Sequence, residues 1–118
     1  NRRRNRKGAR QVTDLEITKL CAEAMGEHIN SRSSELMVYV DDGGLDMEYN
    51  PLHNDAQAMA LVKKLSLFIE CRFFADEEES QYWNVFQRGY GSSQVMSKDL
   101  NRAICECVAK MQATKPAP

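Results

Sequence analysis

The chain has 118 residues, a length that suits one domain with a core of its own. Its 42% apolar and 28% charged residues are ordinary for a soluble globular protein. No apolar run approaches the ~20 residues that span a bilayer, and no apolar stretch follows the basic start as a signal peptide requires, so we expect a cytoplasmic protein with no membrane partner.

Positive charge is concentrated at the start of the chain. The first ten residues hold six Lys and Arg and no acid, which leaves the rest with a net charge near −7. We expect residues 1–12 to be a disordered basic tail, and we favour a non-native origin, as translated upstream sequence or a cloning artefact. The alternative is a nucleic-acid-binding arm. The acidic body argues against general affinity for phosphate backbones, so nucleic acid is not the expected partner.

The first predicted element is a helix over residues 13–25. Its apolar positions are 17, 20, 21, 24 and 25, the spacing of a helix that buries one stripe. Thr13 is a suitable N-cap, and Glu16, three residues later, completes a capping box. Gly26 is expected just after the end of the helix, because glycine readily takes the left-handed conformation needed there.

A hairpin and a second helix are predicted next. Residues 36–40 are rich in β-formers and residues 45–49 alternate between apolar and polar, so we expect two strands joined by a glycine turn at 41–44. Asn54 is the expected N-cap of a helix that ends at Leu65, with Gln57 at the reciprocal capping position and Ser66 as the stop.

A second, more aromatic hairpin follows. Strands are predicted over residues 67–74 and 81–87, and the acidic segment 76–80 is the expected turn between them. On the returning strand, alternation places Tyr82 and Phe86 on one side and Trp83 and Val85 on the other.

The chain ends with a loop and a third helix. Residues 88–95 are rich in Gly and Ser, and we expect a mobile loop there. Ser97 or Asp99 is the expected cap of a helix that ends near residue 113, with apolar positions at 100, 103, 104, 107, 108 and 111. Residues 115–118 are expected to fray.

The predicted element order is α-β-β-α-β-β-α, which is an α+β fold class. We expect one domain over residues 13–114, with a short antiparallel sheet of two hairpins covered by three amphipathic helices. Helices on both faces of one sheet would bury both sides of the second hairpin. That arrangement would account for Phe68 and Phe74 opposite Ile69 and Phe73.

Three segments of the chain resemble a known group of proteins. They are residues 13–26, residues 49–65 with Asp55-Ala56-Gln57-Ala58-Met59-Ala60-Leu61-Val62, and residues 99–111 with Ala103-Ile104-Cys105. Together they resemble small uncharacterised phage and prophage proteins of the phage ABA-sandwich type. The resemblance implies a fold of helices around a short sheet and an origin in a mobile gene element, and it implies no molecular role.

The cysteines offer little chemistry. Each lies among apolar residues of a predicted helix or strand, where we expect it to be reduced, buried and inert; they are Cys21, Cys71, Cys105 and Cys107. A metal site at Cys105 and Cys107 is the alternative, but two residues on a helix differ by roughly 200° around its axis, which does not suit a shared ion. We therefore expect no metal and no cofactor.

No catalytic set is predicted either. His53 stands at the entry to the second helix and is interpreted as a surface or capping residue, with a base or ligand as the alternative. The segment 89–93 has glycines in the wrong pattern for a phosphate loop. The acidic run 76–79 is interpreted as a solvated turn, with nucleic-acid mimicry against a host enzyme as the alternative.

The aromatic hairpin is the favoured functional feature. Its aromatic residues exceed what one small sheet face needs, so we expect a patch for a second copy of the chain, most simply in a symmetric dimer, with a host protein as a further partner. The predicted interaction surface consists of Tyr82, Trp83, Phe86, Arg88 and Tyr90. The alternative is a small-ligand or enzymatic pocket between sheet and helices at Tyr49, His53 and Trp83.

Overall fold

The structure is a computed structural model that describes residues 12–73, 81–89 and 93–114. The helices are α1 (Asp14–Ala24), α2 (Asp55–Leu65) and α3 (Leu100–Ala113). The strands are β1 (Val38–Asp42), β2 (Leu45–Tyr49), β3 (Phe68–Phe73), β4 (Gln81–Phe86) and β5 (Val95–Ser97). The predicted α+β class and element order are confirmed, with β5 as an additional short strand.

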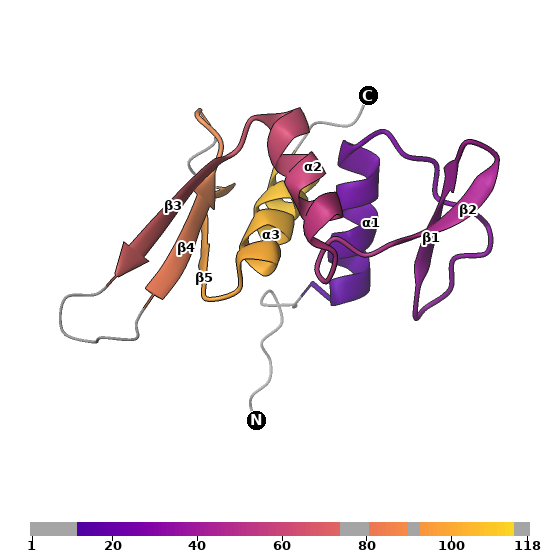
Figure 1. Ribbon diagram of the computed structural model, residues 1–118, viewed down its shortest axis with the longest axis horizontal. Coiled ribbons are helices and arrows are strands. Elements are labelled where there is room, and N and C mark those ends of the chain that lie inside the picture. Colours follow the sequence, from indigo (N-terminus) through magenta and orange to yellow (C-terminus); the bar gives the residue numbers. More distant parts are fainter. Residues whose placement is uncertain (1–11, 74–80, 90–92, 115–118) are drawn as a thin grey trace.

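The helices form a central layer with one sheet at each end (Figure 1). The hairpin of β1 and β2 is a sheet of its own beside α1, and β3, β4 and β5 form a second sheet beside α3. The expectation of one sheet with helices on both faces is therefore wrong. Since α1 packs directly against α3, the helix layer separates the two hairpins and leaves each sheet covered on one side.

Local capping fixes the start of α1 as predicted. The Thr13 hydroxyl accepts a hydrogen bond from the Glu16 backbone N–H at 3.1 Å, and the Glu16 carboxylate accepts one from the Thr13 N–H at 2.9 Å. The C-cap is Met25, followed by Gly26 with φ +76°. Both predicted boundaries of α1 are confirmed.

The start of α2 differs in one respect from the prediction. Asn54 is the N-cap and accepts from the Gln57 N–H at 2.9 Å, as expected. The Gln57 side chain does not return to Asn54: its oxygen accepts from the Asn50 N–H at 2.6 Å and its amide donates to the Glu48 carbonyl at 3.0 Å. This side chain therefore ties α2 to the end of β2. The predicted stop is confirmed, since Ser66 takes the left-handed conformation.

The first hairpin begins later than predicted. Its strands are in register through Asp42 opposite Leu45, with Gly43 and Gly44 as a two-residue turn at φ +61° and +89°. Residues 36 and 37 are not in β1, because the Ser34 hydroxyl accepts from both of their backbone N–H groups and holds a local turn. Leu36 is 89% exposed as a result.

The second sheet contains a short strand, β5, that begins at the last residue of the predicted mobile loop. Val95 of β5 is buried and lies opposite Val85 of β4, so residues 93–95 do not behave as a loose loop. Three strand residues are too few to give a recognisable alternation. The predictions for residues 1–11, 74–80, 90–92 and 115–118, that for Phe74 included, lie outside the described residues.

The core is centred on α3. Seven of its residues are buried: Ala103, Ile104, Cys105, Cys107, Val108, Ala109 and Met111. The helix contacts α1, α2, β4 and β5, and this is why Cys105 and Cys107 are both buried although they point in different directions. The expectation that the second hairpin is buried on both faces is wrong, because Phe68 and Phe73 of β3 are 41% and 65% exposed.

Candidate functional site

The side of the second sheet turned away from α3 is the first candidate site, and we call it the outer face. Strand register places seven side chains on it: Phe68, Glu70, Arg72, Tyr82, Asn84, Phe86 and Met96. The opposite side carries Val85, Val95, Ile69 and Trp83, all packed in the core. Every helix of the described residues lies on the core side of this sheet (Figure 1).

Cations lie over aromatic rings at both ends of the outer face. The rings of Phe68 and Phe86 have centroids 5.2 Å apart, and the Arg88 guanidinium lies over Phe68 at 5.6 Å. The Lys98 ammonium lies over the Tyr82 ring, also at 5.6 Å. Each cation–π contact orders a long basic side chain across a hydrophobic ring. The outer face thus has an aromatic ring covered by a cation at each end of the sheet, with the polar pair Glu70 and Asn84 between them.

The middle of the outer face contains an incompletely satisfied amide. Asn84 is only 3% exposed, although none of the three described helices covers this side of the sheet. Its amide nitrogen donates to the Glu70 carboxylate at 3.2 Å, whereas its oxygen Oδ1 finds no hydrogen-bond partner among the described residues. A buried acceptor without a partner costs free energy.

The edge of the same sheet is open. The strand order is β3-β4-β5, so within residues 12–73, 81–89 and 93–114 the strand β3 pairs on one side only. Five of its six residues are exposed, and the sixth, Ile69, is half-buried. An edge strand of this length offers a row of backbone donors and acceptors to another strand, and native proteins usually shorten or cover such edges.

The structure separates the residues of the predicted interaction surface. Tyr82 and Phe86 lie on the outer face and Arg88 reaches over it, whereas Trp83 lies on the opposite face against the core. Tyr90 lies outside the described residues. Sequence reasoning missed Phe68 and Lys98. Alternation already placed Phe68 opposite Ile69, but nothing local showed which of the two faces would lack a helix.

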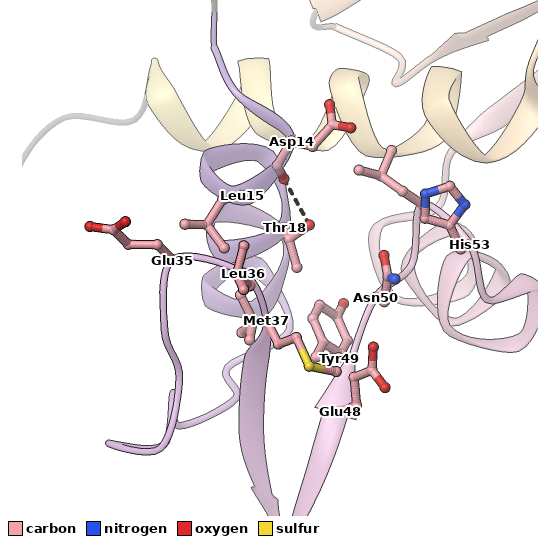
Figure 2. A pocket seen from close by; sticks show the side chains of 12 residues that line it. Asp14, Leu15, Thr18, Glu35, Leu36, Met37, Glu48, Tyr49, Asn50 and His53 are labelled. Carbon is pink, nitrogen blue, oxygen red and sulfur yellow. Dashed lines mark hydrogen bonds between the residues drawn. The ribbon is translucent and has the colours of Figure 1, made fainter.

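A hollow of about 270 Å³ between α1 and the first hairpin is the second candidate site (Figure 2). Tyr49 and His53 both line it, as the alternative prediction expected. Trp83 does not, because it belongs to β4 at the opposite end of the molecule. The remaining lining comes mainly from the first turn of α1 and from residues 35–38.

Carboxylates dominate the polar lining of this hollow. Asp14, Glu35 and Glu48 approach it from three separate segments. Asp14 is already paired with Arg102 at 2.6 Å, and hydrogen bonds to Asp14 and Glu106 raise the pKa of that guanidinium above its ordinary value. Glu35 and Glu48 are exposed and give the hollow a negative rim.

Tyr49 forms part of the wall of the hollow. It is 5% exposed, and its hydroxyl has no hydrogen-bond partner among the described residues. Burial, aided by the nearby thiol of Cys21, raises the pKa of this phenol well above its ordinary value. The hydroxyl is therefore a neutral group that stays protonated, and it is not suited to act as a base.

The cysteines are all free, and three of them are buried as expected. The Cys21 thiol donates to the Cys105 carbonyl at 3.6 Å, and contact with Cys105 together with burial raises the pKa of Cys21 strongly. Burial raises the pKa of Cys107 to about 11. The prediction is wrong for Cys71, which is exposed on the edge strand β3, where the described part of the chain supplies a neighbouring strand on one side only.

The described residues were also searched for metal sites and membrane spans, and the sequence was compared with known proteins. Within residues 12–73, 81–89 and 93–114, no group of three or more His, Cys, Asp or Glu side chains is placed to hold a metal ion. None of the helices described is long and apolar enough to span a membrane. Comparisons with protein-family models, with curated proteins and with solved structures found no match to this chain.

Proposed function

We propose that this chain is a non-catalytic interaction protein that self-associates through the edge and outer face of its second sheet. The partner copy adds its own β3 to the open edge, which gives a symmetric dimer with a continuous sheet across the two-fold axis. The aromatic rings and cations of the outer face then form one surface that extends over both copies.

The observation that carries this proposal is the open strand β3. Its exposed backbone is accompanied by Phe73, which is 65% exposed, and by Phe68 at 41%. Exposed apolar residues beside an unpaired strand mark sites where a second chain adds to a sheet. A dimer that pairs β3 with β3 satisfies the strand and removes Phe73 from water in a single step.

The biological setting is a further part of the proposal. The resemblance of residues 13–26, 49–65 and 99–111 to phage and prophage proteins supports an origin in a mobile gene element. A host protein is then a natural partner for the outer face, because its aromatic residues and Arg88 are of the types that anchor protein interfaces. The free state of all four thiols supports a reducing compartment such as the cytoplasm.

Light scattering on the full chain tests self-association. We expect a mass close to twice the 13.5 kDa of one chain, and we expect Phe73→Lys to shift the equilibrium to the monomer because it places a charge on the pairing edge. Leu45→Lys is the matched control, since Leu45 is 73% exposed on the other sheet and should leave the dimer intact. A monomer at all accessible concentrations would contradict the proposal.

The acidic hollow supports a second candidate function, the binding of a small cationic ligand. Its volume of about 270 Å³ is close to the lower end of ordinary ligand sites, and its rim is negative at Glu35 and Glu48. We expect benzylamine to shift the amide resonances of residues 35–38 and 48–53, and Glu48→Gln to weaken that binding severalfold. Unchanged spectra at millimolar benzylamine would remove this candidate.

A further inference from the structure

The sequence of β3 also selects a register for the pairing, and this inference rests on the proposed function. We propose that two copies pair their β3 strands antiparallel with Cys71 directly opposite Cys71 of the second copy. Glu70 then lies opposite Arg72 of the second copy, and Ile69 lies opposite Phe73. Because of the two-fold symmetry, each of these cross-strand pairs occurs twice in the dimer.

The geometry of a continuous sheet restricts the possible registers. Residues opposite one another in an antiparallel pair share a face, and a two-fold axis perpendicular to the sheet keeps the outer face on the same side in both copies. One residue of β3 must therefore lie at the two-fold axis, directly opposite the same residue of the second copy. Only Glu70 and Cys71 are central enough to pair five described residues of β3.

Charge decides between these two registers. With Glu70 on the axis, the two Glu70 carboxylates face each other directly, which is unfavourable. With Cys71 on the axis, Glu70 faces Arg72 of the second copy, so that two ion pairs form on the outer face. Both residues are exposed in the single chain, and Glu70, which accepts from Asn84 through Oε1, has its second carboxylate oxygen for this contact.

Apolar contacts favour the same register. The opposite side of the sheet then brings Phe73, 65% exposed in the single chain, against Ile69 of the second copy. Aromatic and β-branched residues form favourable cross-strand pairs. The axis position itself is filled by the small side chain of Cys71, which accepts a hydrogen bond from the Gln81 amide of its own chain at 3.0 Å.

Cross-linking tests the residue on the axis. Directly opposite Cα atoms are about 4.5–5.5 Å apart, so a short bismaleimide should join the two Cys71 thiols in the native protein. We expect a covalent dimer from the full chain and none from Cys71→Ser. The other three thiols are buried and should not react before unfolding.

Charge exchange tests the neighbouring pairs. We expect Glu70→Arg to weaken dimerisation about tenfold or more, because both ion pairs become repulsive. The double variant Glu70→Arg with Arg72→Glu should restore affinity to within a few-fold, since the pairs are only exchanged. Glu70→Gln should weaken the dimer less than Glu70→Arg, and it keeps an acceptor for the Asn84 amide, which separates the charge effect from a local packing effect.

The outcomes distinguish this inference from the proposed function. A dimer by light scattering that gives no Cys71 cross-link, or that the double variant fails to restore, overturns the register and leaves self-association standing. A monomer under all conditions overturns both. A cross-linked dimer together with restoration by the double variant supports both.

Discussion

Leu61→Ala is expected to lower the free energy of unfolding by about 3 kcal/mol. Leu61 is fully buried in α2, which packs against α3 at the centre of the helix layer. Its truncation removes apolar contacts and leaves a cavity that rigid neighbours on α3 fill only in part. Urea unfolding measures this loss. We expect a lower midpoint with an unchanged slope of the free energy against urea concentration, which indicates a change in stability alone.

Met59→Ala in the same helix is the matched control for this prediction. Met59 is 40% exposed two positions away, so the same change to alanine should cost about 1 kcal/mol or less. Equal losses in the two variants would show that α2 is not held against α3 as the structure has it. Both variants introduce alanine in place of a residue of similar helix propensity, so differences in propensity do not enter the comparison.

Features set by short-range chemistry could be predicted from the sequence. The hydroxyl of Thr13 and the amide of Asn54 each satisfy a backbone N–H three residues ahead, so they fix where α1 and α2 begin. Gly43 and Gly44 likewise fix the turn of the first hairpin, since both take positive φ. Each of these depends on a few neighbouring residues and on nothing distant in the chain.

The arrangement of the two sheets depends on distant contacts and could not be predicted in the same way. Nothing in the pattern of residues 38–49 shows that their hairpin packs on α1 rather than joining the second hairpin. The strand β5 was missed because its three residues are defined by pairing with β4. The start of β1 was misplaced because the Ser34 side chain holds residues 36 and 37 in a turn.

The candidate site shows the same division between local and distant information. Alternation along β4 correctly separated Tyr82 and Phe86 from Trp83 and Val85. It could not reveal which pair faces the core, because both are apolar. The exposure of Phe68 follows from the absence of a helix on the outer face of the described structure, which only the packing of α1 against α3 determines.

Raising the pH from 8 to 10.5 is expected to destabilise the fold, with about 2 kcal/mol of the loss due to Cys107 alone. Burial raises the pKa of Cys107 from 9.0 to about 11, so the folded protein holds the thiol proton more tightly than the unfolded chain does. Its stabilising contribution is therefore complete below pH 9 and is lost as the pH rises towards 11. The raised pKa of Cys21 adds a loss of the same sign.

Comparison with Cys107→Ala assigns the alkaline loss to its source. The variant has no thiol to deprotonate at this position, so its free energy of unfolding should fall less steeply between pH 8 and 10.5 than that of the unchanged chain. The measurement is urea unfolding at fixed pH with a reductant present, which keeps disulfides from contributing. Because alanine leaves a small cavity, the comparison is between the two pH slopes and not between absolute stabilities. If the free energy of unfolding fell equally steeply with pH in both proteins, the Cys107 thiol would ionise as readily in the folded protein as in the unfolded chain. That result would contradict the burial of Cys107 in the core, where α3 packs against α1, α2, β4 and β5.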